Sequence, residues 1–561
     1  MSKTKFIREY LESLKEDNEL DYIIPLLLEA MNFRIVTKPT DSKGCDQYGK
    51  DVVAIGKEDG QLFLWYFIIK GNADKDITNH SFNVREGIRD SLLAAKDVRY
   101  VDRSIPYLNS LKRKIAIVHA GSTNDNAKVQ FNSLIEDTFE PGEVEDWNLD
   151  KLVNLFAEYL YDESLLCDDV AYKLLKKTLL LCDAPGWKED DVRALVQRMH
   201  QICPIANKRS VISTLAGLKL VLSMILDTCR ENKNLLPAKV ASDVIVLTTW
   251  GWILRNNWEQ KAYILKSFDG LVYKHLLIYE EYVGKILPLA RDLRGLYMRG
   301  SEMEKIFYPM RCYDFLADLM YYYIVVARLH DEKVVREMQE DAMQVIESNS
   351  GFEIMTLDTQ SIPLLMLAKF LFAEPFTCEQ AIYERFVKYL DNLLSNLIHR
   401  YRKENMLPEL YGNRKACALS LYEKSSEYVD CSSLLLVSLV ELIAWLGYDI
   451  FYNALRELIK ESKVDLQVVF PIPDENLEIN LFDHSLRDEV CVETGIQLPK
   501  TMAGFKKSFV KRYDPIPFRT EETPYGFLLL LAHKYYQTDL FPDFVNFGFW
   551  QYMTKGENRI N

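Results

Sequence analysis

The chain has 561 residues, a net charge of −14 and 48% apolar residues. A chain of this length is expected to form two to four domains, and its apolar content excludes a mainly disordered protein. The acidic balance argues against a general nucleic-acid-binding protein, because phosphate neutralisation needs Lys and Arg. Any nucleic acid must therefore meet a local positive patch, or one that a partner supplies.

The ten cysteines occur singly and form no CxxC motif, which excludes zinc-ribbon and thioredoxin-like sites. Scattered cysteines in a long chain are typical of reduced core residues in a cytoplasmic protein. The segment Met1–Glu9 is polar and charged, unlike a secretory signal. No apolar run reaches the roughly 18–20 residues that span a bilayer, so we expect a cytoplasmic protein without a membrane partner.

The first 70 residues change from a helical to an extended period. Apolar residues recur at helical spacing through residue 32. Three apolar runs then predict strands, at Phe33–Thr37, Asp51–Ile55 and Gln61–Lys70. The short turn Lys57–Gly60 joins the last two strands as a hairpin.

The next 90 residues predict alternating helices and one more strand. Val84–Lys96 reads as a helix, Lys114–Val118 as a strand, and Asn124–Asp137 and Trp147–Tyr161 as helices, the last capped by Asp146 or Asn148. The order α-β-β-β-α-β-α predicts a layered α/β domain on a mixed sheet, over residues 1–160.

Beyond residue 160 the strand signal nearly vanishes. Apolar helical runs separated by prolines predict a large all-α region over residues 161–561, in one or two subdomains, with Val464–Phe470 as a potential lone strand. No fixed repeat period is visible, so a regular solenoid is not predicted. We expect this region to sense a trigger, bind a partner subunit or oligomerise the protein.

The most informative chemistry lies in the predicted hairpin. Asp51 opens one strand and Lys70 closes the next, and these two positions meet at the same end of a hairpin. A carboxylate that holds a divalent metal and a Lys that steadies phosphorane charge are the groups that phosphodiester cleavage uses.

Gly49-Lys50-Asp51, a turn, and an aromatic-rich strand ending in Ile68-Ile69-Lys70 resemble the PD-(D/E)xK nuclease superfamily. The pattern is most similar to Mrr-type restriction endonucleases and nuclease domains of bacterial anti-phage systems, and it covers residues 1–160. The resemblance implies a restriction-endonuclease-like α/β domain that cleaves DNA, in preference to RNA, with Mg²⁺ or Mn²⁺. The helical region in turn leads us to expect a protein partner subunit or a homo-oligomer.

The resemblance assigns Asp51 as the main metal ligand, Lys70 as the catalytic Lys and Glu29 as the second acid. One departure matters, because Ile68 stands where the family places Glu, Asp or Gln, and Mg²⁺ needs oxygen ligands. Glu29 or Asp46 could supply the second ligand, or the backbone carbonyl of Ile69 could serve beside Asp51. The third alternative is an inactive site in a fold that only binds.

Two functions from different classes therefore remain open. One is a metal-dependent nuclease of anti-phage defence. The other is a non-catalytic, nuclease-like scaffold subunit of a defence complex, for which replacing Asp51 would change only stability. A weaker third hypothesis is a helical ribonuclease centred on Arg193 and His200, whose spacing matches the Rx₆H pattern of HEPN-type enzymes.

Several further patterns carry less weight. Asp314 and Asp318 share a helix face, which is typical of a solvated acid pair, and Tyr321–Tyr323 is typical of helix packing. Three clusters of basic residues could contact phosphate. They are Lys112 to Lys114, Arg400 with Arg402 and Lys403, and Lys506 and Lys507 with Lys511 and Arg512. The last cluster is interleaved with Phe505, Phe509 and Tyr513, whose rings could stack on bases.

Overall fold

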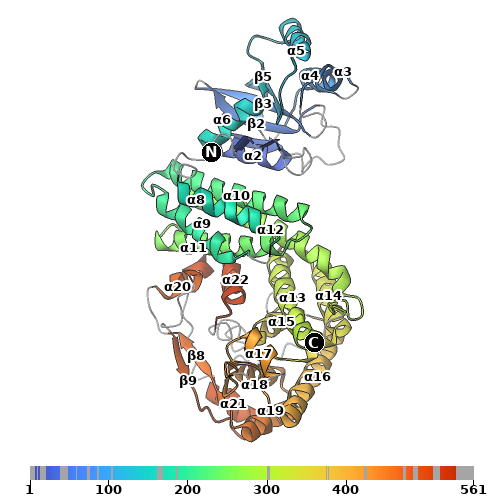
Figure 1. Ribbon diagram of the computed structural model, residues 1–561, viewed down its shortest axis with the longest axis vertical. Helices are drawn as coiled ribbons and strands as arrows, with labels where there is room; N and C mark the ends of the chain where they lie inside the picture. The colour runs from blue at the N-terminus through green and yellow to red at the C-terminus, as the bar shows by residue number, and fades with distance from the viewer. Residues whose placement is uncertain are drawn as a thin grey trace. The chain divides into compact units, whose positions relative to one another are not determined.

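The computed structural model describes most of the chain beyond residue 20 (Figure 1). The described residues are 7–8, 11–12, 20–37, 49–58, 60–71, 76–84, 87–102, 105–160, 168–184, 187–299, 303–373, 376, 378–421, 426–471, 476–483, 490–509 and 518–538. They fall into two compact units. Unit 1 comprises residues 1–237 and 263–271, and unit 2 comprises residues 238–262 and 272–561.

Unit 1 is built around a mixed sheet, as the sequence predicts, but the sheet has a fifth strand that the sequence did not predict. The strand order is β1-β2-β3-β4-β5. The pairs β1–β2 and β2–β3 are antiparallel, whereas β3–β4 and β4–β5 are parallel. The strands are β1 Arg34–Thr37, β2 Val52–Glu58, β3 Gln61–Lys70, β4 Lys112–His119 and β5 Val144–Trp147.

Helices cover both faces of this sheet, because the central strands carry apolar side chains on both sides. One face packs against α3 Asn79–Asn83, α4 Ile88–Asp97 and α5 Asp125–Thr138, and Tyr66 and Ile68 lie in that core. The other face carries an aromatic cluster in which Trp65 and Phe67 contact Phe33 and Trp147, on the side of α2 Asp21–Ala30 and α6 Leu149–Leu155.

The predicted boundary at residue 160 marks the end of the sheet, but unit 1 continues into helices. These are α8 Asp169–Leu181, α9 Glu189–Ile202 and α10 Lys208–Glu231. The last of them is long and apolar enough to cross a membrane by length and composition, contrary to the expectation that no segment is. However, 72% of its most apolar stretch is buried inside the protein, which is typical of a core helix.

Unit 2 is mainly helical. Its helices are α11 Leu236–Arg255, α12 Ala262–Ala290, α13 Glu304–Val326, α14 Glu332–Ser348, α15 Ser361–Phe372, α16 Gln380–Glu404, α17 Arg414–Ser420, α18 Leu434–Leu446, α19 Asp449–Ser462, α20 Leu477–Asp483, α21 Met502–Phe509 and α22 Phe527–Tyr536. The division between the units passes through the first two, because residues 236–237 of α11 and 263–271 of α12 belong to unit 1. Long apolar segments such as α15 and α18 are buried on all sides, which makes them core helices rather than surface helices.

The prediction of an all-α region after residue 160 is wrong in one detail. The region contains two small two-stranded sheets, β6 Ser432–Ser433 with β7 Asp465–Leu466, and β8 Val468–Pro471 with β9 Val490–Glu493. The segment predicted as a potential lone strand is therefore paired. Its partners lie far away in the sequence, so local pattern could not identify them.

Candidate functional site

The hairpin places Asp51 and Lys70 on one face of the sheet, at one end. Val52 pairs with Phe67 in the antiparallel register, and the Asp51 N–H donates a hydrogen bond of 2.9 Å to the Phe67 carbonyl. Asp51 therefore stands beside Ile68, and alternation along β3 directs Ile68 and Lys70 to the same side. That side is the one covered by α3, α4 and α5.

Gly49 of the Gly-Lys-Asp motif has a structural reason to be glycine. Its φ is +71°, in the left-handed region that side chains rarely adopt. A Cβ atom at this position would lie 2.2 Å from the backbone oxygen of Ser91 in α4. The motif thus fixes the close approach of the loop to this helix immediately before Asp51.

The Asp51 carboxylate turns back onto the backbone. Its Oδ2 accepts a hydrogen bond of 2.6 Å from the Ile69 N–H. Burial raises the pKa of Asp51, and the Ile69 N–H and the Lys70 charge offset this rise only in part. One carboxylate oxygen is therefore already engaged, and the environment disfavours the ionised form that a metal would need.

Ile68, directly beside Asp51, belongs to the hydrophobic core. It is 1% exposed and packs in the cluster that contains Val53 and Tyr66. The Ile69 side chain is also buried and points to the other face, while its N–H serves Asp51. The position at which the resemblance implies a second oxygen ligand is therefore occupied by an apolar residue with apolar neighbours.

Glu29 is not brought to Asp51 and Lys70. It lies on α2, on the opposite side of the sheet (Figure 1), where its carboxylate forms an ion pair of 3.8 Å with Lys219 of α10. The alternative ligand Asp46 lies outside the described residues.

Lys50 is a residue of the site that sequence reasoning missed. Its side chain is buried, and its Nζ lies 5.3 Å from the centre of the Tyr66 ring. Burial, with a smaller effect of the Arg113 charge, lowers the pKa of Lys50 to about 8. Its position next to Asp51 in the motif indicated that it lies near the site. Its burial depends on packing that the motif does not determine.

A His–Asp pair at the same sheet edge was also missed. His119 ends β4 and pairs in register with Lys70. It is fully buried, and its Nε2 lies 2.9 Å from Asp146 Oδ1, while Thr123 donates a hydrogen bond of 3.2 Å to the other oxygen of Asp146. Asp146 belongs to β5, although its sequence position before a helix predicted only a helix cap.

The described residues do not fit the Mg²⁺ or Mn²⁺ site that the resemblance implies. Among them, no group of three or more His, Cys, Asp or Glu side chains is placed to hold a metal ion. Asp51 has an apolar neighbour where a second oxygen ligand is expected, and its own carboxylate is engaged by the backbone.

No family model, curated protein or solved structure matches this chain.

The predicted ribonuclease pair of α9 does not present an open site. His200 is buried, at 8% exposure, and faces the core of unit 1 with Val196 and Met199. A general acid or base must reach its substrate, so a buried histidine among apolar neighbours favours a packing role.

The basic clusters near the sheet and in α21 are also partly engaged. Arg113 forms an ion pair with Glu143, and Lys114 pairs with Glu58 and Glu145. In the third cluster, Phe505 is buried and contacts the Tyr452 ring at 6.0 Å, so it is not a platform for bases. Lys511, Arg512 and Tyr513 lie outside the described residues.

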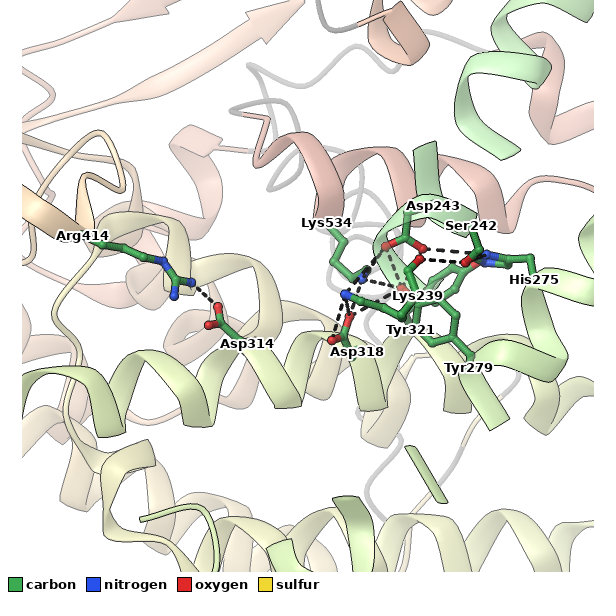
Figure 2. A network of polar contacts seen from close by, with 10 residues as sticks. All are labelled: Lys239, Ser242, Asp243, His275, Tyr279, Asp314, Asp318, Tyr321, Arg414 and Lys534. Atoms are coloured by element: carbon green, nitrogen blue, oxygen red, sulfur yellow. Dashed lines mark hydrogen bonds and ion pairs between the residues drawn. The ribbon is translucent and has the colours of Figure 1, made fainter. Parts of the chain in front are cut away.

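Unit 2 contains a buried charge network that the sequence did not reveal (Figure 2). The expectation that Asp318 is solvated is wrong, because it is 5% exposed on α13. Lys239 of α11 lies 2.9 Å from its carboxylate, and Lys534 of α22 also binds it. Asp314, one turn earlier, is partly exposed and pairs with Arg414.

The network continues through hydroxyl groups and one histidine. Tyr279 donates a hydrogen bond of 2.9 Å to Asp243 and accepts one of 2.6 Å from Lys534. Burial raises the pKa of Asp243, although the charges of Lys534 and Lys239 lower it in part. Burial also raises the pKa of Asp318, but here the charges of Lys239 and Lys534 outweigh it, and the net shift is downward.

His275 is held neutral by this arrangement. Ser242 donates its hydroxyl proton to the Lys239 carbonyl, so its oxygen accepts from His275 Nδ1 at 2.9 Å. His275 Nε2 then accepts a hydrogen bond of 2.9 Å from the Tyr321 hydroxyl. Burial, together with the charges of Lys534 and Lys239, lowers the pKa of His275 to about 3. The network has no solvent-facing group among these members, which favours a role in holding α11, α12, α13 and α22 together.

Proposed function

We propose that this protein is a non-catalytic interaction subunit whose N-terminal domain is a nuclease-like fold without metal-dependent cleavage. The observation that carries the proposal is the setting of the Asp51 carboxylate next to Ile68. The carboxylate is engaged by the Ile69 N–H, and the neighbouring position is a core isoleucine. A hard divalent cation needs several oxygen ligands, and the described residues do not provide them at this edge.

The charge distribution around the sheet supports a protein partner over a nucleic acid. Arg113 and Lys114 are paired with glutamates, and the whole chain is acidic. Nucleic-acid binding gains most of its affinity from cations that neutralise phosphates, and cations already paired with carboxylates contribute less. In this proposal the helical region holds the partner or a second copy of the chain, in the cytoplasm of a bacterial cell under phage attack.

A second candidate is the metal-dependent nuclease of anti-phage defence, acting on DNA or RNA. The observation that favours it is the juxtaposition of Asp51 and Lys70, because the Lys70 charge offsets part of the rise that burial causes in the pKa of Asp51. It needs a second oxygen ligand from a partner or from residues outside the described ranges, beside Asp51 and the Ile69 carbonyl.

The test is a cleavage assay on plasmid DNA and total RNA, with Mg²⁺ or Mn²⁺ against EDTA. Wild type, Asp51→Ala and Lys70→Ala are compared at equal concentration. The proposal expects no metal-dependent cutting by any of the three. Metal-dependent cutting by wild type that both substitutions abolish would establish the nuclease instead.

The partner is tested by purifying tagged protein from its native host and determining the stoichiometry of what co-purifies. The proposal expects a defined protein partner or a defined oligomer, retained in the Asp51→Ala variant. A monomer that co-purifies with nucleic acid alone would contradict it.

A further inference from the structure

A cleft in unit 2 combines cationic and apolar walls. Its volume is about 450 Å³, within the range of small-molecule sites. Lys305 reaches it from α13, and Arg400 and Lys403 reach it from α16. Ile354 and Leu421 line it with apolar surface, although each remains more than a third exposed.

The charges at this cleft are only partly balanced. Arg400 lies 3.2 Å from Glu404, which also lines the cleft, and donates to the Met355 carbonyl, so its position is fixed. Among the described residues, Lys305 and Lys403 have no carboxylate within ion-pair distance. Two unpaired ammonium groups on one cleft are unusual in a chain of net charge −14, and they favour an anion.

Helix electrostatics explains only part of the arrangement. Cations are stabilised in the last turn of a helix, which accounts for Lys403 near the end of α16. It does not account for Lys305, which lies in the first turn of α13, where a cation is disfavoured. The convergence of these two lysines on a cleft with an apolar wall is what a ligand would explain.

We propose that this cleft binds a small phosphate monoester with an apolar or aromatic body, of nucleotide size. Lys305 and Lys403 would contact the phosphate, because the charge of Arg400 is already balanced by Glu404. Ile354 and Leu421 would pack against the body of the ligand, which removes their exposed apolar surface from water. The site is separate from the N-terminal sheet and does not depend on the function proposed for it.

The experiment is isothermal titration of the full chain with AMP, inorganic phosphate and adenosine at low salt. AMP is expected to bind more tightly than either fragment, because each fragment fills only one part of the cleft. Its affinity should fall as salt is added. Lys305→Ala and Lys403→Ala are each expected to weaken AMP binding about five- to tenfold.

Matched variants separate the site from general charge effects. Lys388→Ala removes an exposed lysine of the same helix outside the cleft and should leave the affinity unchanged. Ile354→Trp, which fills the apolar wall, should weaken AMP more than inorganic phosphate. The proposal is overturned if wild type binds none of the three probes, or if the Lys305→Ala/Lys403→Ala double variant binds AMP as wild type does.

Discussion

Gly49 is the residue whose backbone is most tightly constrained at the sheet edge. Alanine at this position would adopt a left-handed φ and also meet the Ser91 carbonyl oxygen at 2.2 Å. We expect Gly49→Ala to lower the free energy of unfolding by more than about 2 kcal/mol. Gly60→Ala is the matched control, since Gly60 has a φ of +81° but no atom within 4 Å of its added Cβ. Urea unfolding followed by circular dichroism should show a clearly smaller loss for Gly60→Ala, and equal losses would refute the steric argument.

Ile68 decides between the two functions proposed for the N-terminal domain. Ile68→Glu would place a second carboxylate beside Asp51, at a buried position where two acids repel each other. A divalent ion would relieve this repulsion. We therefore expect Mn²⁺ to raise the melting temperature of Ile68→Glu by about 5 °C or more at saturation, and to leave wild type unchanged.

The control for this substitution is Ile68→Gln, which adds a polar side chain of similar size without the charge. Its melting temperature should respond to Mn²⁺ less than that of Ile68→Glu. A Mn²⁺ response in wild type that Asp51→Ala removes would contradict the non-catalytic interpretation.

The sequence predicted the proximity of Asp51 and Lys70 because a hairpin with a short turn leaves little freedom in register. It did not predict the burial of Lys50, His119 or Asp318. Polar residues are usually exposed, and their burial depends on helices and strands that pack on them from distant parts of the chain. For the same reason Glu29 seemed available to the site, although α2 covers the other face of the sheet.

At the scale of elements, Asp314 and Asp318 provide a direct comparison, because they lie one turn apart on α13. Asp318→Ala would leave Lys239 and Lys534 buried without this carboxylate, and we expect a loss of about 3–5 kcal/mol. Asp314→Ala removes an exposed pair with Arg414 and should cost less than about 1 kcal/mol. Urea unfolding measures both losses. A loss for Asp318→Ala as small as that expected for Asp314→Ala would show that the network contributes little to stability.

The same network connects α22, close to the end of the described chain, to three other helices. Hydrogen exchange provides the measurement that follows this connection. In Lys534→Met the amides of α22 should exchange faster than in wild type, while those of α16, which contributes no residue to the network, should be unchanged. A uniform increase over both helices would indicate general destabilisation instead of a local attachment.

Elements with a clear local pattern were predicted well, and those that depend on pairing were not. The helix predicted at Asn124–Asp137 is α5, with Asn124 as its N-cap, and Asn148 caps α6 as expected. Strand β5 was missed, because its sequence Val-Glu-Asp-Trp is half polar and is followed at once by a helix cap. Among the described residues its ladder is the parallel pairing with β4, from which α5 separates it in the sequence.

At the scale of the whole molecule, composition predicted large cores but not where they divide. Unit 1 joins the sheet domain with α8, α9 and α10, and a short piece of α12 returns to it at residues 263–271. Strand content alone marked residue 160 as a boundary. A division that depends on which helices bury which surfaces is a property of packing, and helical periodicity gives only the buried face and not its partner.

The pH dependence of stability is a property of the whole chain to which buried histidines contribute. Burial lowers the pKa of both His275 and His533 to about 3. In the unfolded chain a histidine titrates near 6.5, so the unfolded state takes up protons first as the pH falls. The stabilisation is complete above about pH 6.5 and is lost progressively between pH 6.5 and 3. Between pH 7.5 and 5, each histidine should lower the free energy of unfolding by about 2 kcal/mol.

The contribution of one histidine is isolated by comparing wild type with His533→Gln in urea unfolding from pH 7.5 to 5. Terms from carboxyl groups are shared by both proteins and cancel in the difference. Because glutamine does not titrate, the variant should lose about 2 kcal/mol less than wild type over this range. The side chain of His533 contacts Thr538, an interaction that glutamine can retain, so the comparison tests the titration rather than a lost contact. Parallel pH profiles for the two proteins would mean that His533 protonates as readily in the folded chain as in the unfolded one.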